Sequence, residues 1–283
     1  MRMKPSTHVF TEKYIVLEKQ VGETPLAAVE AFRARANIAT DVPLAYAGRL
    51  DPLASGALLV LIGEECKKQS SYHALDKEYE FEVLLSYASD TGDVLGLAEH
   101  RAPAHIPTQK EITTVLASLI GTHKLPYPHY SSKTVHGKPL FLWTLEGRLN
   151  EIEIPTVDTT IYKLKLIDIY SRSKDELAQC IEEKISSIPE VTDENKKLGA
   201  DFRRTDIRAR WKEIFTNIPD AEHAMILRIR CTSASGAYMR TLAGAIGEKL
   251  GSQGLALSIH RTKMGRYWHL PLLPRVGFWR RKL

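Results

Sequence analysis

The sequence predicts a chain of mixed helices and strands, and two kinds of segment support this. Residues 57–62 form a continuous apolar run typical of a buried strand, and residues 159–170 alternate polar and apolar side chains as a half-buried strand does. Residues 25–38 fit a helix with a proline near its first turn. Residues 108–119 fit another, with Glu111 at capping-box spacing from Thr108. A length of 283 residues with 43% hydrophobic content suits one large domain or two small ones.

The other elements follow in chain order from the same patterns. We expect strands at 14–18, 79–85, 150–154 and 224–231, an extended loop at 125–128, and a helix from Tyr238 to about Leu250.

Residues 172–222 interrupt this pattern. Residues 174–188 form an amphipathic helical pattern, residues 189–199 resemble a polar, acidic linker, and residues 201–218 predict a second, basic helix. We therefore expect a domain over residues 1–270, interrupted by a helical insertion at 172–222, and a basic C-terminal tail at 271–283.

Composition and charge are those of a soluble globular protein that could bind a polyanion. The net charge is +5, and basic side chains gather in two places. One group lies in the insertion and comprises Arg203, Arg204, Arg208, Arg210 and Lys212. The other lies near the C-terminus and comprises Arg261, Lys263, Arg266, Arg275, Arg280, Arg281 and Lys282. This second group is interleaved with four aromatic residues, Tyr267, Trp268, Phe278 and Trp279. Basic side chains contact phosphates and aromatic rings stack on bases, although a solvated charged end would show the same pattern.

Membrane, secreted and metal-binding classes are not indicated. The longest apolar runs are far shorter than a membrane span, and no apolar segment follows the basic N-terminus as in a signal peptide. Three isolated cysteines favour a reducing compartment, hence the cytoplasm, and no structural zinc. His123, His129 and His136 lack carboxylate or thiolate partners at ligand spacing, so we expect no metal there.

The segment with the clearest chemistry is residues 47–56, directly before the buried strand. Asp51 precedes a proline, which restricts it to extended geometry, and Gly48 and Gly56 bracket it where a backbone could approach closely. A carboxylate held in this way suits a nucleophile or a base. A plain turn before a strand is the alternative, since Asp-Pro is common in turns.

Four blocks together resemble the TruB-type tRNA pseudouridine synthases. Residues 48–56, Gly-Arg-Leu-Asp-Pro-Leu-Ala-Ser-Gly, are similar to that family's catalytic loop. Residues 76–79 with 89–93, residues 130–133 and residues 235–243 are similar to its three further blocks, in the family's order. The resemblance extends from about residue 16 to residue 268, and the insertion has no counterpart in the family's core pattern.

This resemblance implies an α+β fold with a mixed, mainly antiparallel sheet flanked by helices and a cleft for RNA. It implies an isomerase that converts the T-loop uridine of tRNA, position 55, to pseudouridine without a cofactor or metal. The expected partner is the T-arm of tRNA, and the expected state is a monomer. The small PUA domain that often follows the family's catalytic domain does not fit in the fifteen residues after Trp268.

The resemblance also assigns roles to individual residues. Asp51 corresponds to the nucleophile, Arg240 to the arginine that pairs with it, Tyr238 to an active-site tyrosine beside the base, and Tyr79 to the tyrosine that stacks on the flipped uridine. Further residues expected to contact the substrate are Tyr46, Lys19, Arg49, Lys77, Ser131, Lys133 and Arg261. Tyr46 stands where the family usually has a histidine that takes part in base flipping.

Two other functions stay open on the sequence. Gly-Arg-Leu-Asp alone also fits pseudouridine synthases that act on ribosomal RNA, although Pro52 and residues 131–133 favour the tRNA class. An RNA-binding protein that assists tRNA folding with little catalysis is the other alternative. An Asp51→Asn variant would separate the enzyme from the chaperone.

Overall fold

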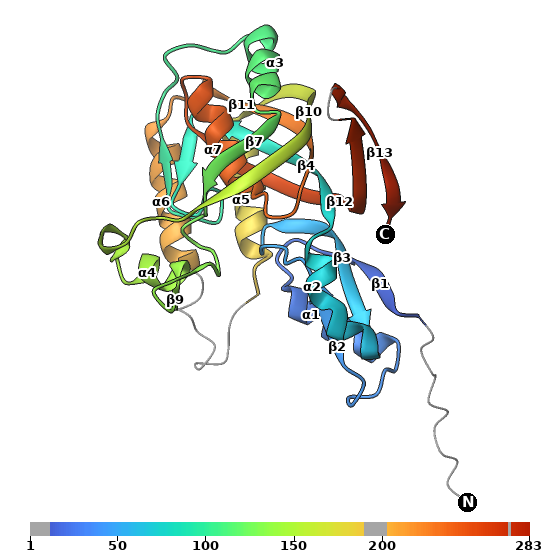
Figure 1. The fold of residues 1–283 in the computed structure, drawn as a ribbon. Helices are drawn as coiled ribbons and strands as arrows, with labels where there is room; N and C mark the ends of the chain where they lie inside the picture. The colour runs from blue at the N-terminus through green and yellow to red at the C-terminus, as the bar shows by residue number, and fades with distance from the viewer. Residues whose placement is uncertain (1–11, 190–202, 271–272) are drawn as a thin grey trace, which may run out of the picture.

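The computed structural model describes residues 12–189, 203–270 and 273–283, which form one large sheet with helices on both faces (Figure 1). Seven strands of the sheet run in the order β1-β3-β12-β4-β11-β10-β7, with β13 paired to β12 and β2 paired to β3. The strands of this sheet are β1 (Tyr14–Lys19), β2 (Leu44–Ala47), β3 (Ala54–Ile62), β4 (Asp76–Leu85), β7 (Gly121–Pro126), β10 (Thr156–Ser173), β11 (His223–Ser233), β12 (Gly254–Leu270) and β13 (Leu273–Lys282).

The helices and two small hairpins surround this sheet. The α-helices are α1 (Pro25–Arg35), α2 (Gln69–His73), α3 (Gln109–Ser118), α4 (Leu140–Leu145), α5 (Lys174–Ser186), α6 (Arg204–Asn217) and α7 (Met239–Lys249). The hairpins pair β5 (Tyr87–Ser89) with β6 (Ala98–His100) and β8 (Thr134–Val135) with β9 (Lys138–Pro139), and 3₁₀ turns occupy Gly63–Lys68 and Leu149–Glu151. None of the helices in the described ranges is long and apolar enough to cross a membrane.

The predicted α+β class with a mixed, mainly antiparallel sheet is confirmed. Among the described strands of the large sheet, β12 and β3 alone pair in parallel, with Ile259–Arg261 beside Ala54–Gly56. This parallel contact brings the C-terminal part of the chain against the segment that follows Asp51.

Most predicted elements are present, and two predictions are wrong. The helix capped by Thr108 forms its capping box with Glu111, as predicted. Residues 121–126, which include the start of the expected extended loop, form β7 because they find a partner strand in β10. Residues 150–154 form no strand; a 3₁₀ turn occupies their start, and their alternating pattern has no neighbouring strand to pair with in the described chain.

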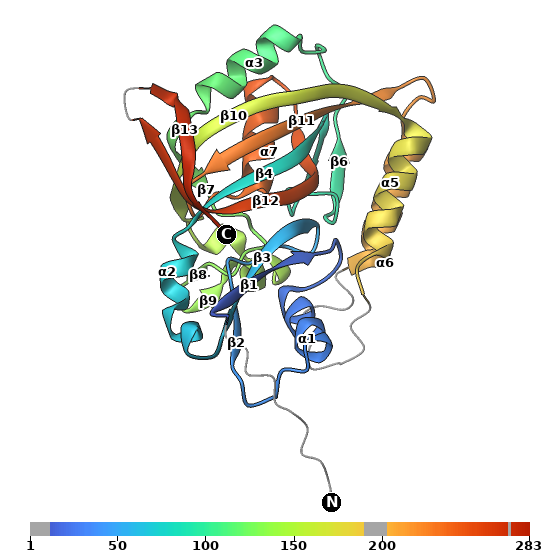
Figure 2. The ribbon, with the colours of Figure 1, turned by 90° about the vertical axis from the view of Figure 1, so that its right-hand side faces the viewer.

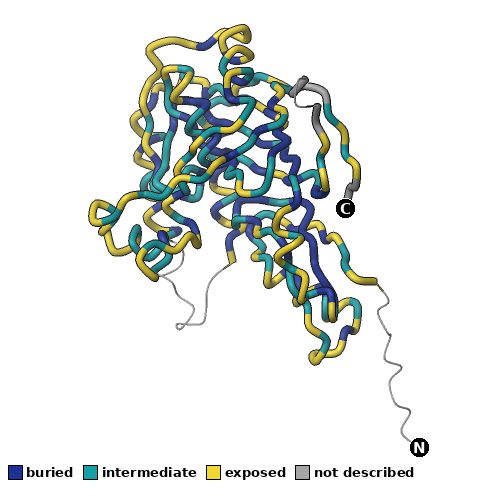
Figure 3. The backbone as a smooth tube through the Cα atoms, viewed as in Figure 1, coloured by how far each residue is buried: buried dark blue, intermediate teal, exposed yellow. Residues whose placement is uncertain are grey.

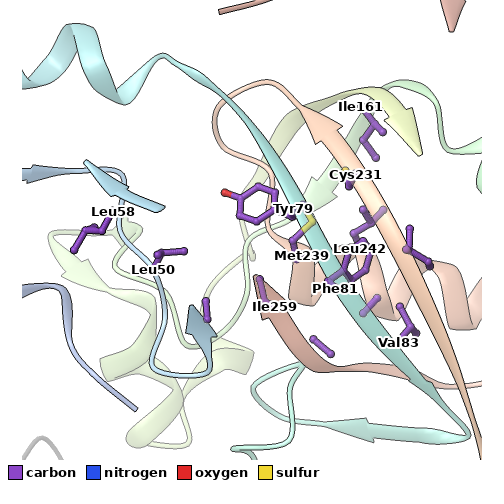
Figure 4. Packing of buried hydrophobic residues seen from close by; sticks show 14 of the residues in the cluster. Leu50, Leu58, Tyr79, Phe81, Val83, Ile161, Cys231, Met239, Leu242 and Ile259 are labelled. Carbon is purple, nitrogen blue, oxygen red and sulfur yellow. The ribbon is translucent and has the colours of Figure 1, made fainter. Parts of the chain in front are cut away.

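The described residues form three hydrophobic clusters, and β4 contributes to two of them because successive side chains of a strand point to opposite faces of the sheet. Tyr79, Phe81, Val83 and Leu85, every second residue of β4, pack in one cluster with residues of α3 and α7. Leu84 packs in the other cluster, with residues of α5 and α6. Figure 3 shows the buried backbone concentrated along the sheet, and Figure 4 shows part of the first cluster.

The helical insertion predicted at 172–222 contains α5 and α6, which form a helical hairpin and lie side by side at the end of the sheet away from β13 (Figure 2). Buried Trp211 of α6 donates its indole N–H to the carbonyl of Val94 at 3.0 Å. Most of the predicted linker at 189–199 lies outside the described residues. Residues 273–282, expected as part of a tail, form β13 against β12.

Candidate active site

The loop that carries Asp51 connects β2 to β3 and is fixed by a close backbone contact. The amide of Ala54 donates to the carbonyl of Asp51 at 3.0 Å, and Leu53 and Ala54 are buried. Gly56 has a φ of +100°, and a Cβ there would lie 2.3 Å from the carbonyl oxygen of Arg261. Glycine is therefore required where β3 meets β12, which is the close approach that the sequence predicted.

Two fully buried cations hold the backbone of this loop. The ammonium of Lys19 donates to the carbonyl of Ala54 at 2.6 Å. The guanidinium of Arg261 donates to the carbonyls of Ala57 at 2.7 Å and Gly48 at 3.0 Å. Lys19 and Arg261 are 0% and 1% exposed, respectively. Both were expected to contact substrate, and in this structure their nitrogen atoms donate hydrogen bonds to backbone carbonyls around the loop.

Burial lowers the pKa of Lys19 to about 8, partly offset by the nearby carboxylates of Glu23 and Asp51. Lys19 lies outside the lining of the cavity described below. Its contacts are therefore structural ones, and its expected role in substrate binding stays a prediction.

Asp51 and Arg240 form the central pair of the site. Arg240 Nε donates to Asp51 Oδ2 at 2.8 Å, and the Arg240 side chain is 5% exposed while that of Asp51 is 39% exposed. The other guanidinium nitrogens of Arg240 donate to the carbonyls of Thr91 at 2.7 Å and Tyr130 at 3.1 Å. Arg240 is thus held by two other loops, while one carboxylate oxygen of Asp51 is oriented and its side chain stays accessible.

A second carboxylate, Asp93, lies behind Arg240 and was not singled out from the sequence. Its Oδ2 is 3.8 Å from Arg240 Nε, and its Oδ1 accepts hydrogen bonds from the Thr91 hydroxyl at 2.7 Å and the Leu95 amide at 3.0 Å. Burial raises the pKa of Asp93 to about 6, although Arg240 opposes the shift. The block at 89–93 was the signal that could have identified it.

Two tyrosines face the same cavity as Asp51. Tyr79, on β4, lies between Leu50 of the loop and the packed residues of the first core, with its hydroxyl on the side of the loop (Figure 4). Tyr238 immediately precedes α7, and its ring meets the ring of Tyr127 edge-on at 5.7 Å. Burial raises the pKa of both tyrosine hydroxyls, so both stay protonated at neutral pH.

The cavity has a volume of about 750 Å³ and is bounded by several elements. Of the residues expected from the sequence, Asp51, Tyr79, Tyr238, Arg240, Arg49, Lys77, Ser131 and Arg261 line it. Apolar side chains of α4, α5 and α6, among them Phe141, Ile185 and Ile207, form another part of its wall. The cavity therefore combines a carboxylate, several cations and apolar surface, as a site for a nucleotide would.

Lys77 and Ser131 contribute polar groups to this cavity. The buried ammonium of Lys77 donates to the carbonyl of His73 at 2.9 Å and to the hydroxyl of Ser235 at 3.1 Å, and burial lowers its pKa to about 8. The hydroxyl of Ser131 is buried and makes no hydrogen bond within the described residues. Arg49 is exposed at the cavity edge.

Tyr46 and Lys133 do not reach this cavity. Tyr46 lies on β2, opposite Val60 of β3, half-buried against the first core. Its role in base flipping is therefore not supported by its position. Lys133 is exposed, with its ammonium 5.1 Å from the centre of the Tyr127 ring. No group of three or more potential metal-ligating side chains is gathered anywhere in the described ranges.

The arginines of the insertion, expected on the RNA, are bonded within the protein. Arg203 pairs with Asp90 at 2.6 Å, and Arg204, 8% exposed, donates to the carbonyl of Ile188 at 3.0 Å. The two other arginines likewise have partners: Arg208 pairs with Glu182 at 2.9 Å, and Arg210 donates to the carbonyl of Ala98 at 2.7 Å. These contacts join the hairpin to itself and to the sheet domain, and the phosphate contacts expected from the sequence stay a prediction.

Comparison with known proteins identifies the family. By fold, the chain resembles a chain in the crystal structure of a Cbf5-Nop10-Gar1 complex, with a TM-score of 0.52 and 15% identity over 89% of this chain and 48% of the other. Residues 38–184 match the model of the TruB family pseudouridylate synthase (N terminal domain). The chain belongs to the TruB family. The matched segment includes Asp51, Tyr79, Asp93 and Tyr130 and ends within α5.

Curated relatives agree with this assignment. The chain is 28% identical over 253 residues to tRNA pseudouridine synthase B of Aromatoleum aromaticum, covering 89% of this chain and 63% of the relative. It is 27% identical over 222 residues to the protein of that name from Caldanaerobacter subterraneus, covering 78% and 59%. The chain thus spans about three fifths of the length of these relatives.

Proposed function

We propose that this protein is a tRNA pseudouridine synthase that isomerises the T-loop uridine at position 55, with Asp51 as its nucleophile. The observation that carries the proposal is the Asp51 carboxylate, which lines a cavity and accepts a hydrogen bond from buried Arg240. The chain that presents this pair belongs to the TruB family. The curated relatives named tRNA pseudouridine synthase B support tRNA as the substrate.

The reaction needs a nucleophile and an oriented base but no external reactant. The C1′–N1 bond breaks, the uracil turns, and a C1′–C5 bond forms; C5 loses a proton and N1 gains one, so the product is an isomer of the substrate. An ionised Asp51 can attack either C6 of the base or C1′ of the ribose. The charge-assisted hydrogen bond from Arg240 favours the ionised carboxylate and sets its direction in both cases.

The target base must leave its stack in a folded RNA loop to reach Asp51, which costs a few kcal/mol. Tyr79 and Tyr238 offer aromatic surface in the cavity for the extruded base. Stacking on an aromatic side chain contributes about 1–3 kcal/mol per base and would offset much of that cost. The protonated tyrosine hydroxyls supply hydrogen-bond donors rather than a base.

The proposal is tested by mapping pseudouridine in a T-loop stem-loop RNA treated with wild-type protein or with Asp51→Asn. We expect modification of the T-loop uridine by the wild type alone, with RNA binding kept in the variant. Modification of ribosomal RNA fragments instead would assign the protein to the other substrate class. Tight binding by both proteins without modification would favour the RNA chaperone.

A further inference from the structure

Arg203 of the insertion contacts two separate loops of the catalytic domain. It precedes α6, and its Nη1 donates to Asp90 Oδ2 at 2.6 Å. Its guanidinium also lies over the ring of Tyr130, 4.7 Å from the ring centre. The tyrosine hydroxyl is 3.4 Å from the same Asp90 oxygen. One guanidinium therefore joins an acidic side chain and an aromatic ring that come from different segments of the chain.

The same two loops hold Arg240. The carbonyl of Thr91, next to Asp90 in the chain, accepts from Arg240 Nη1, and the carbonyl of Tyr130 accepts from Arg240 Nη2. The second Asp90 oxygen accepts the amide of Leu97 at 2.8 Å. The Arg240 guanidinium is thus held between the same two loops that Arg203 connects, and Arg203 also lines the cavity.

We propose that Arg203 is a positioning residue through which the helical insertion supports the reaction. By joining Asp90 to Tyr130 it keeps the Thr91 and Tyr130 carbonyls at the spacing that Arg240 requires, and Arg240 in turn orients Asp51. The inference rests on the proposed function for its catalytic part. Arg203 thereby gives the insertion a role in supporting the active site. The sequence predicted only RNA phosphate contacts for this segment.

The local environment makes this contact effective. The side chains of Arg203 and Asp90 are 21% and 30% exposed, so water screens their attraction less than that of a surface pair. The Tyr130 ring adds a cation–π contact. The planar guanidinium can serve the carboxylate and the ring together, whereas the ammonium of a lysine is a point charge.

The first test compares turnover by Arg203→Gln and by a matched control, Arg208→Gln. Arg208 lies on the same hairpin and pairs with Glu182 of α5, outside the cavity lining. We expect Arg203→Gln to lower kcat for pseudouridine formation by about 10- to 100-fold, with KM changed less than about 2-fold, because small displacements of reacting groups reduce rate more than binding. Arg208→Gln should keep both values. A raised KM with unchanged kcat would make Arg203 a substrate contact and overturn the proposal.

A double-mutant cycle adds a test of the route. Asp90→Asn removes the charge that Arg203 meets, so the double variant should lose little more kcat than either single variant. If the kcat loss of the double variant equals the product of the two single losses, Arg203 and Asp90 act independently. That result would overturn the proposed connection between Arg203 and Asp90.

Amide hydrogen exchange tests the connection without reference to activity. The amide of Leu97 is bonded to Asp90 Oδ1, and that of Phe141 to the carbonyl of Ser131, next to Tyr130. Both amides should exchange faster in Arg203→Gln and at the wild-type rate in Arg208→Gln. Unchanged exchange overturns the proposal. If the wild-type protein modifies no RNA, the proposed function fails, and the exchange rates still decide whether Arg203 joins the two loops.

Discussion

At the scale of single residues, the site is organised around one buried guanidinium. Arg240 contacts Asp51 at 2.8 Å and lies 3.8 Å from Asp93, and it also donates to two carbonyls. These two carboxylates raise the pKa of Arg240 against the opposing effect of burial. The two carboxylates differ in environment, since Asp51 is accessible and Asp93 is enclosed. Burial therefore distinguishes an accessible carboxylate, which we propose as the nucleophile, from an enclosed one.

An Arg240→Lys variant tests the geometry of this guanidinium. The lysine keeps the charge but cannot make the same three directed hydrogen bonds, so Asp51 should lose its orientation. We expect kcat to fall by about 100-fold or more. The measurement is single-turnover pseudouridine formation. Activity within a factor of three of wild type would contradict the role given to Arg240.

The buried carboxyl of Asp93 predicts a pH dependence of stability. Its pKa is raised from 3.8 to about 6 in the folded protein, so between about pH 4 and pH 6 the folded state binds more protons than the unfolded state. The stability that this carboxyl contributes is therefore present below pH 4 and lost as the pH rises through 6. The asparagine of an Asp93→Asn variant does not titrate, so only the wild type should lose this stability. The free energy of unfolding of the variant minus that of the wild type should therefore rise by on the order of 3 kcal/mol between pH 4 and pH 7. Urea denaturation at several pH values measures it, and a constant difference would contradict the expectation.

At the scale of elements, the parallel contact between β3 and β12 positions the loop that carries Asp51. Lys19 from β1 and Arg261 from β12 meet the loop from both sides and donate to its carbonyls. Gly56 allows the backbones of β3 and β12 to approach closely. The conformation of the loop is therefore fixed by strands that lie far apart in the sequence, and these contacts also determine the position of Asp51.

A glycine comparison tests the importance of this contact. In Gly56→Ala the new Cβ would lie 2.3 Å from a carbonyl oxygen at a φ of +100°, so either β12 or the loop must move. We expect a loss of at least about 2 kcal/mol in the free energy of unfolding. The control is Gly63→Ala, where φ is +61° and no atom lies within 4 Å of the added Cβ. That variant should lose about 1 kcal/mol from backbone strain alone. Equal losses, measured by denaturant unfolding, would argue against a special contact at Gly56.

At the scale of the whole molecule, the sheet domain and the hairpin together line the cavity that contains Asp51, while β13 and the end of β12 form a ribbon on the side away from α5 (Figure 2). On this ribbon Trp268 and Phe278 are 45% and 57% exposed, with ring centres 5.3 Å apart. Their strand neighbours Tyr267 and Trp279 form a separate ring pair, in which Tyr267 also meets Tyr162 of β10. The ribbon therefore has an exposed aromatic pair as well as one joined to the domain.

The exposed pair predicts a second contact with RNA. If bases of the substrate stack on these rings, replacing both Trp268 and Phe278 with alanine should weaken tRNA binding by about 1–3 kcal/mol per base contacted. The control is Ile106→Ala, which removes a 68% exposed apolar side chain from a loop. Fluorescence anisotropy with labelled tRNA measures the affinities. Equal affinities for the double variant and the control would exclude stacking on the ribbon.

Local sequence patterns predicted the elements whose signals lie within a few residues. The capping box at Thr108 and the apolar run of β3 are examples, because caps and periodicity act over one or two turns. The extended loop expected at 125–128 and the strand expected at 150–154 were wrong, because residues 121–126 form β7 and residues 149–151 form a 3₁₀ turn. Pairing with a distant strand, which a local pattern does not contain, decides whether an extended segment joins a sheet.

The sequence by itself determined the family resemblance, the fold class and the presence of Asp51, Tyr79, Tyr238 and Arg240, since each lies in a recognisable block. Tertiary structure alone decided which cations are hydrogen-bonded within the protein, and some of these, among them Arg203 and Arg261, also line the cavity. Lys19, Arg261 and Arg203 look in the sequence like cations available to RNA, but each is bonded within the fold. The physical reason is burial: a cation removed from water must be satisfied by nearby carbonyls or carboxylates, and only the folded chain brings those partners together.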